Sequence, residues 1–220
     1  DFMEIKIYED KSRKIATKEN NIHVKNGFNH HEQTSVAPPT LLQPLPEYLQ
    51  IGLEARHKKV EEFLYDQIGK PFYSKLGFIL YCGDCCKFLE RLQRTDLKVN
   101  LTVTSPPYNI GKEYEDKTSV DSYIDWCKKW ISQIYEVTDN KGSFWLNLGY
   151  LDVPYKGLCV PIPYLLWDKS PFYMLQEIVW HYGAGVAAKR RLSPRNEKWI
   201  FYVKNPVDYT FNLDVIRDSN

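Results

Sequence analysis

The stretch V-N-L-T-V-T-S-P-P-Y, residues 99–108, decides the fold of this chain. Apolar and polar residues alternate over 99–103, which is the pattern of a half-buried β-strand. Pro106 and Pro107 must end that strand, because proline has no N–H group for a sheet and fixes its own φ angle. A polar loop therefore begins just past the carboxyl end of a strand, where open α/β sheets place their ligands.

Strand and helix patterns alternate on both sides of this stretch. Phe78–Tyr81 is a short apolar run that predicts a buried strand, and Gly83-Asp84 follows it as a turn and a candidate helix N-cap. Apolar residues at helical spacing predict helices from 85 to 92 and from 127 to 134. Further strand-like runs lie at 143–148, 178–182 and 199–203. The sequence thus predicts an α/β fold whose sheet is at least partly parallel.

The chain changes character near residue 46. Residues 1–45 are polar, contain charge runs and several prolines, and show no sustained helical or strand period. From Pro46 to Lys70 apolar residues are interleaved with charged ones, which predicts a helix that ends at Gly69 and is broken or kinked near Gly52. We therefore expect a polar N-terminal extension over 1–45 and one folded domain over 46–220.

Composition excludes some classes of protein and leaves others open. The 220 residues include 29 Lys and Arg against 28 Asp and Glu, a formal charge of +1, so a nucleic-acid surface would have to come from local clustering. No stretch approaches the roughly 18 uncharged apolar residues of a membrane helix, and residues 1–20 are too charged for a signal peptide. We expect no membrane partner and a soluble, cytoplasmic protein.

The cysteines indicate a reducing compartment. There are five of them, an odd number, and three lie within five positions: Cys82, Cys85, Cys86, Cys127 and Cys159. The spacing Cys82-Gly-Asp-Cys85 is similar to that of a thioredoxin-like redox pair. As a zinc site it is poor, because a single C-x-x-C lacks a second pair of ligands. We expect buried, inert thiols and no metal.

The loop after the strand offers hydrogen-bond acceptors in fixed directions. The prolines leave it little conformational freedom, and since neither has an N–H group, the carbonyls of Ser105 and Pro106 can point outward as acceptors. Ser105 adds a hydroxyl group and Tyr108 a flat ring. Such a set suits a planar ring that bears an exocyclic amine, because the amine needs acceptors and the ring needs a stacking partner.

These residues carry a family resemblance. The motif Thr104-Ser105-Pro106-Pro107-Tyr108, preceded by Tyr81–Leu89 and followed by Asn109–Tyr114, resembles the amino-methyltransferases of restriction-modification systems, in the circularly permuted β class. The downstream segments 180–193, 197–200 and 209–212 look like a later block of the same class. The resemblance covers roughly residues 78 to 217, and the ordered set is more specific than a lone Pro-Pro-Tyr, which is a common loop motif.

The resemblance implies a fold, a reaction and a set of site residues. It implies a partial Rossmann-like sheet of an S-adenosylmethionine-dependent methyltransferase, acting on double-stranded DNA by base flipping. Ser is typical of cytosine-N4 enzymes at the first motif position and Asp of adenine-N6 enzymes, so cytosine N4 is expected and adenine N6 is the alternative. It assigns the target amine to Ser105, Pro106, Pro107 and Tyr108, and the cofactor to Asp84, Thr104 and Ser105.

One family element has no clear counterpart. Family members carry a glycine-rich loop beside the methionine part of S-adenosylmethionine, which in the β class lies toward the C-terminus. The nearby candidate Gly183-Ala184-Gly185 lacks a strand-to-helix context. We therefore expect that a further segment or a second chain carries this loop, and a non-catalytic DNA-recognition subunit, or one half of a split enzyme, is the other hypothesis.

A basic run follows this candidate. Five cations lie within ten positions of a loop that contains Ser and Pro: Lys189, Arg190, Arg191, Arg195 and Lys198. In isolation a solvated basic loop would be the better explanation, but beside a DNA methyltransferase motif these residues predict phosphate contacts.

Overall fold

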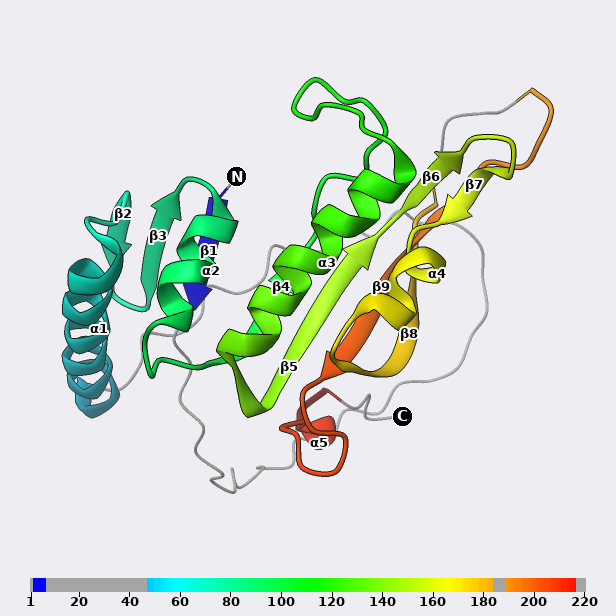
Figure 1. Cartoon of the computed structure of the whole chain (residues 1–220). Helices are drawn as coiled ribbons and strands as arrows, with labels where there is room; N and C mark the ends of the chain where they lie inside the picture. Colours follow the sequence, from blue (N-terminus) through cyan, green and yellow to red (C-terminus); the bar gives the residue numbers. More distant parts are fainter. Residues whose placement is uncertain (1, 7–46, 184–188, 217–220) are drawn as a thin grey trace, which may run out of the picture. The chain divides into compact units, whose positions relative to one another are not determined.

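The computed structural model describes residues 2–6, 47–183 and 189–216 (Figure 1). Contacts along the chain divide it into two compact units, residues 1–82 and residues 83–220, which are described separately below. Most of the expected extension over 1–45 lies outside the described residues. Its strand at Phe2–Lys6 was not predicted from the sequence.

The first unit combines a helix with a small antiparallel sheet. Strands β1 (Phe2–Lys6), β2 (Tyr73–Lys75) and β3 (Phe78–Cys82) pair in the order β1-β3-β2, and α1 spans Glu47–Ile68. The imidazole of His57 on α1 hydrogen-bonds the Ser74 hydroxyl on β2 at 3.0 Å. The Tyr81 hydroxyl on β3 donates to the carbonyl of Gly69, just past α1.

Two expectations for this unit need correction. The predicted helix is confirmed and ends at Ile68, directly before Gly69, whose φ of +109° suits glycine, but the break near Gly52 is wrong. Gly52 faces open space and a lone helical glycine costs only about 1 kcal/mol, so α1 continues through it. In β3 only Ile79 is fully buried and Phe78 is 44% exposed, because an antiparallel strand alternates between two faces.

The second unit begins with the predicted turn and helix. Asp84 is the N-cap of α2 (Cys85–Gln93), and its carboxylate accepts a hydrogen bond from the Cys86 amide at 2.9 Å. The helix buries Phe88, Leu89 and Leu92, the face that the spacing predicts. It packs on α3 (Val120–Val137), where the Gln133 side chain donates to the carbonyl of Cys86.

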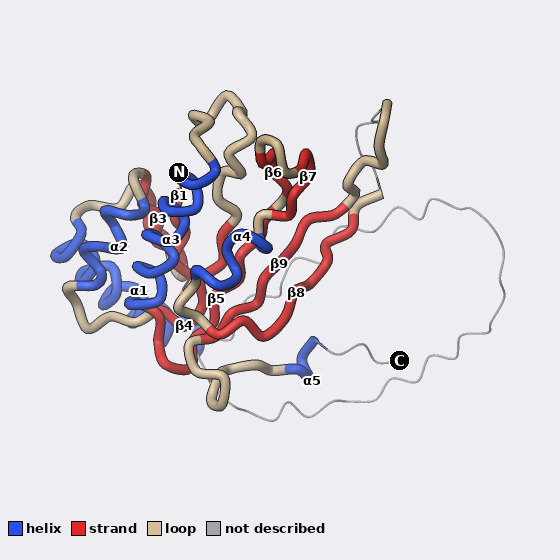
Figure 2. Tube along the Cα trace, turned by 45° about the vertical axis from the view of Figure 1, so that its right-hand side comes forward, coloured by secondary structure: helices blue, strands red, loops and turns tan. Residues whose placement is uncertain are grey.

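The main sheet is mixed, as expected. Strands β4 (Val99–Thr104), β5 (Thr138–Leu148), β9 (Asn196–Val203) and β8 (Tyr173–His181) lie side by side in the order β4-β5-β9-β8 (Figure 2). β4 and β5 are parallel and α3 connects them, whereas β9 is antiparallel to both of its neighbours. The α/β class with a partly parallel sheet is therefore confirmed.

The core lies on one face of this sheet, where α3 crosses β4 and β5 (Figure 1). Phe144 on β5 is fully buried, and its ring contacts those of Trp130, Phe172 and Tyr202 at centroid distances of 6.3, 5.2 and 5.7 Å. On the opposite face Trp145 stacks on Phe201 at 4.3 Å. Strand alternation thus separates two aromatic clusters.

Short elements complete the second unit. They are the β6–β7 hairpin (Tyr150–Val153 and Gly157–Pro161), α4 (Pro163–Leu166), a 3-10 turn at Trp167–Lys169, and α5 (Leu213–Ile216). The hairpin follows β5 after a single residue, Gly149. None of the helices in the described part of the chain is long and apolar enough to cross a bilayer.

Candidate active site

The Ser-Pro-Pro-Tyr motif lies at the carboxyl end of β4, as the sequence predicts. Thr104 is the last residue of the strand and pairs with Leu146 of β5. A loop over 105–119 then leads to α3, whose N-cap is Ser119. Ser105 is exposed at the start of this loop, whereas the next three motif residues are half-buried.

Two hydroxyl groups of the motif converge on one buried amide. The hydroxyls of Ser105 and Tyr108 both donate to Oδ1 of Asn147 on β5, at 3.2 and 2.7 Å, and lie 3.0 Å from each other. Asn147 is 2% exposed, and its amide nitrogen lies 3.5 Å from the carbonyl of Lys198 on β9. We call Ser105, Tyr108 and Asn147 the hydroxyl cluster.

A carboxylate adjoins this cluster. Oε2 of Glu197 on β9 lies 3.2 Å from the Tyr108 hydroxyl and is a second acceptor for its one proton, as an alternative to Asn147. Burial, joined by the negative charge of Glu197, raises the pKa of Tyr108 to about 12, although the hydrogen bond from Ser105 acts in the other direction. The phenol therefore keeps its proton at neutral pH and acts as a hydrogen-bond donor.

The Tyr108 ring lies directly over Gly149. A Cβ atom on Gly149 would stand 2.7 Å from Cε2 and 2.8 Å from Cδ2 of that ring. Real side chains do not approach so closely, so this position needs glycine to admit the tyrosine. One side of the ring is thus occupied by backbone, and a flipped base could stack only on another side.

Gly149→Ala is expected to displace Tyr108 and to lower the free energy of unfolding by about 1–3 kcal/mol, as other overpacking substitutions do. The new methyl group would collide with the ring and pull its hydroxyl away from Asn147. Urea unfolding measures the stability change, and Gly183→Ala, at a position with open space, is the control. Equal stability of wild type and Gly149→Ala would contradict the close contact.

The remainder of the loop is fixed by a second set of hydrogen bonds. The carbonyl of Pro107 accepts from the hydroxyl of Tyr123 on α3 at 2.8 Å, and burial holds the pKa of Tyr123 well above its usual range. Asn109 is 5% exposed, has a φ of +60°, and exchanges two hydrogen bonds with the backbone of Thr118. The motif is therefore held from both of its ends.

Glu115 closes the turn beyond the motif. Its carboxylate accepts from the backbone amides of Asn109, Ile110 and Lys112 at 2.7, 2.9 and 3.3 Å. Burial alone would raise the pKa of Glu115, but these amide hydrogen bonds together hold it below its usual value. The turn is thus built on an ionised side chain.

The residues expected at the cofactor lie in the second unit. Thr104 ends β4 beside Ser105, and the exposed carboxylate of Asp84 caps α2 through Oδ1. The Asp84 N-cap predicted from the sequence is confirmed. Of the candidate glycine loop, only Gly183 is described, and its other two positions lie outside the described residues.

A group of possible metal ligands adjoins the same N-cap. The ligand atoms of Asp84, Cys85 and Cys86 lie within 4.8 Å of one another. Burial, followed by the neighbouring Cys85 and Asp84, raises the pKa of the Cys86 thiol to about 11. At neutral pH the Cys86 thiol therefore keeps its proton and is a poor nucleophile. All five cysteines lie within the described residues, and each is a free thiol, but only Cys127 is buried, so the expectation of buried thiols is wrong for the other four.

The predicted DNA contacts fall into two classes. Lys189, Arg190, Arg191 and Arg195 lie on the segment between β8 and β9, and all four are exposed. Lys198 differs, because it lies on β9 with only 13% of its side chain exposed and pairs with Glu177 on β8 at 2.9 Å. The expectation of one basic loop therefore holds for four of the five cations.

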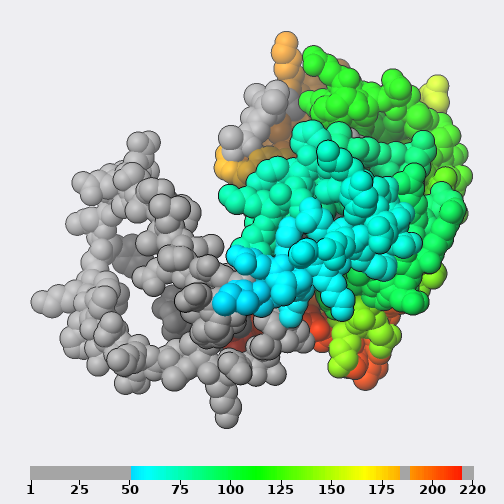
Figure 3. Space-filling view, turned by 90° about the vertical axis from the view of Figure 1, so that its left-hand side faces the viewer, coloured from blue at the N-terminus to red at the C-terminus, as the bar shows by residue number. Residues whose placement is uncertain are grey.

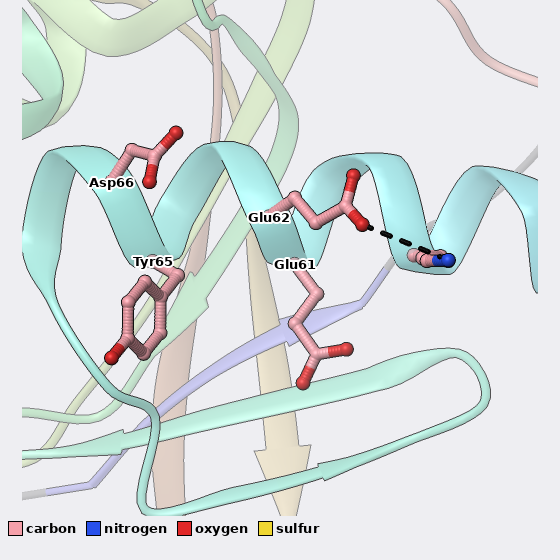
Figure 4. A pocket seen from close by; sticks show the side chains of 5 residues that line it. Glu61, Glu62, Tyr65 and Asp66 are labelled. Carbon is pink, nitrogen blue, oxygen red and sulfur yellow. Dashed lines mark ion pairs between the residues drawn. The ribbon is translucent and has the colours of Figure 1, made fainter.

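A surface hollow lies on α1, within the first unit. Figure 4 shows its lining, which is Lys58, Glu61, Glu62, Tyr65 and Asp66. Lys58 and Glu62 form an ion pair at 3.9 Å, and both side chains are mostly exposed. The outer surface of α1, in cyan in Figure 3, is thus a solvated helix face.

Sequence reasoning missed the partners of the motif. Asn147 and Gly149 lie at the end of a predicted strand, and Glu197 lies in a segment quoted for the resemblance, but none received a role. A polar Asn among the apolar residues of β5 was the available signal, because buried polar side chains require partners.

Comparisons with known proteins agree with the motif. The type II methyltransferase M.ScaI of Streptomyces caespitosus is 54% identical over 153 residues, which cover 70% of this chain and 50% of that protein. M.HpaI of Haemophilus parainfluenzae is 30% identical over 143 residues, which cover 63% of this chain and 42% of that protein. The chain thus spans about half the length of the curated relatives it matches.

A solved structure and a family model also resemble this chain. The PvuII DNA methyltransferase (cytosine-N4-specific) aligns at 18% identity with a TM-score of 0.49, over 63% of this chain and 53% of that chain. The family model described as a DNA methylase matches residues 99–220, which hold the whole hydroxyl cluster. Because this match covers more than half of the chain, the chain belongs to the DNA methylase family.

Proposed function

We propose that this chain forms the amine-methylating part of a type II DNA methyltransferase, which transfers a methyl group from S-adenosylmethionine to the N4 amine of cytosine in duplex DNA. The observation that carries the proposal is the convergence of the Ser105 and Tyr108 hydroxyls on Asn147 at the carboxyl end of β4. A rigid loop presents this cluster, and Ser105 is exposed.

The chemistry requires acceptors for the amine. The lone pair of an aromatic amine is delocalised into its ring, so the nitrogen becomes nucleophilic only when acceptors draw its N–H groups out of the ring plane. Ser105 donates its own proton to Asn147, which leaves lone pairs of its oxygen for the amine. The Pro106 carbonyl is the second proposed acceptor, because no adjacent loop N–H competes for it.

The proposed cofactor residues fit S-adenosylmethionine by the chemistry of their donor set. When bound, that cofactor supplies an electrophilic methyl group. Its ribose hydroxyls and its ammonium group are donors, and the exposed carboxylate of Asp84 and the hydroxyls of Thr104 and Ser105 are acceptors. These three residues are therefore proposed to hold it.

The cations between β8 and β9 are proposed to contact DNA phosphates. Lys189, Arg190, Arg191 and Arg195 can each offer a charge to the backbone, whereas Lys198 is engaged with Glu177. Such contacts position a protein on DNA and carry no sequence information by themselves. The recognition sequence thus depends on other residues.

Arg190→Ala combined with Arg191→Ala is expected to weaken DNA binding for all sequences alike and to reduce the salt slope by about 1–2. Each arginine that neutralises a phosphate releases counterions, so its loss flattens the dependence of log K on log salt. Fluorescence anisotropy at several salt concentrations measures the slope. Lys58→Ala, on the outer face of α1, is the control, and an unaltered slope in the double variant would place the two arginines off the DNA path.

Adenine N6 is the alternative target, because both amines need the same acceptors. The decisive experiment incubates the chain with S-adenosylmethionine and mixed-sequence DNA, digests the DNA to nucleosides and identifies the product by mass spectrometry. N4-methylcytosine supports the proposal, and N6-methyladenine replaces its target base. A folded chain that gives no product favours the non-catalytic half of a split enzyme.

A further inference from the structure

A chain of three polar side chains leads away from the proposed target amine. The hydroxyl oxygens of Ser105 and Tyr108 are 3.0 Å apart, and Oε2 of Glu197 lies 3.2 Å from the Tyr108 hydroxyl. The three residues come from the loop after β4 and from β9, 89 positions apart along the chain between Tyr108 and Glu197. Sheet pairing alone brings them together.

Methylation of an amine creates a proton that must leave. When the nitrogen forms a bond to the methyl carbon, the bond from that carbon to the donor sulfur breaks, and the nitrogen carries a positive charge. One N–H proton must then be lost to restore the neutral product. Asn147 cannot take this proton, because an amide is not a base at neutral pH, but a carboxylate can.

We propose that Glu197 is the final acceptor of this proton, which reaches it through the hydroxyls of Ser105 and Tyr108. For the relay, the Ser105 hydroxyl turns its proton from Asn147 to Tyr108, and the Tyr108 hydroxyl turns its proton from Asn147 to Glu197. The amine proton then passes to the Ser105 oxygen as the Ser105 proton moves to the Tyr108 oxygen and the Tyr108 proton moves to Glu197. Each hydroxyl gains and loses one proton, and the carboxylate ends protonated. The inference rests on the proposed function and adds to it a positioning role for Glu197.

The surroundings of Glu197 fit this role. Its neighbour Lys198 forms its ion pair with Glu177 of β8. Besides Tyr108, the negative charge of Glu197 also acts on Tyr182, just after β8. In the sheet register, Trp180 of β8 pairs with Glu197. Tyr108 keeps its proton because of burial, so it transmits a proton without existing as a free phenolate.

The contact can be tested without enzyme turnover. In the full chain labelled with ¹³C at the tyrosine ring, NMR follows the titration of Tyr108, which is assigned by its loss in Tyr108→Phe. Glu197→Gln is expected to lower the pKa of Tyr108 from about 12, because the negative charge that raises it is gone. An unchanged titration would overturn the relay whether or not the chain is active.

The role is then tested by single-turnover methyl transfer at saturating DNA and S-adenosylmethionine. Tyr108→Phe keeps the ring and removes the relay hydroxyl, and Glu197→Gln removes the acceptor. Each is expected to lower the rate by about 100-fold with little change in DNA affinity, and to abolish the fall of the rate in acid that protonation of the carboxylate causes. Tyr173→Phe, an exposed hydroxyl on β8, is the control.

The outcomes separate the two proposals. A wild-type rate and pH profile retained in Glu197→Gln would overturn the relay and leave the proposed function intact. A wild-type chain that transfers no methyl group would overturn the proposed function for this chain, while the Tyr108 titration still decides the contact. Loss of the acidic limb in both variants, but not in Tyr173→Phe, supports the relay.

Discussion

Ser105→Ala is expected to lower the rate of methyl transfer by about 100- to 1,000-fold, the usual effect of removing one preorganised polar group from a reacting centre. The substitution removes the acceptor proposed to face the target amine and breaks the hydrogen bond to Asn147. Because Ser105 is exposed, the fold has little to lose. DNA affinity and thermal stability should therefore stay close to those of the wild type.

The measurement is single-turnover transfer of labelled methyl groups, together with DNA binding by anisotropy. Ser122→Ala removes another hydroxyl, on the exposed first turn of α3, and serves as the matched control. Transfer by Ser105→Ala at the wild-type rate would remove this residue from the mechanism. A loss of DNA binding equal to the loss of rate would instead make it a binding residue.

Phe144→Ala is expected to lower the free energy of unfolding by about 3–5 kcal/mol, which is a large part of the roughly 5–15 kcal/mol that stabilise a typical domain. Phe144 is fully buried, and three aromatic rings from α3, β9 and the segment before β8 surround it. Its loss removes apolar burial and leaves a cavity between the sheet and its helices.

Urea unfolding followed by tryptophan fluorescence measures this effect. Leu101→Ala is the matched control, because Leu101 lies on the neighbouring strand β4 but is 45% exposed. We expect it to cost less than about 1 kcal/mol. If the two substitutions destabilise the protein equally, the core does not lie where Phe144 is placed.

Local sequence patterns predicted most of the helices and strands. Alternation over 99–103 and helical spacing after Asp84 predicted β4 and α2, because both depend on neighbouring residues. The break at Gly52 was wrong, because a lone helical glycine that faces open space costs only about 1 kcal/mol and does not end a helix. The order of the strands could not be read, because it depends on contacts between distant segments.

The same division applies to the candidate site. The motif residues 105–108 were predicted because they are contiguous and rigid. Asn147 lies 42 positions beyond Ser105, and Glu197 lies 89 beyond Tyr108, so only the folded sheet brings them to the motif. Gly149 was missed because a glycine after a strand is usually explained by a turn.

The candidate site forms only when β4 and β5 pair in the correct register. Thr104 pairs with Leu146, so Ser105 and Asn147 come next to each other at the following position. A slip of one residue between the strands would turn Asn147 toward the aromatic core and leave the Ser105 hydroxyl without its acceptor. A chain with misaligned strands would therefore contain the complete motif but would be catalytically inactive.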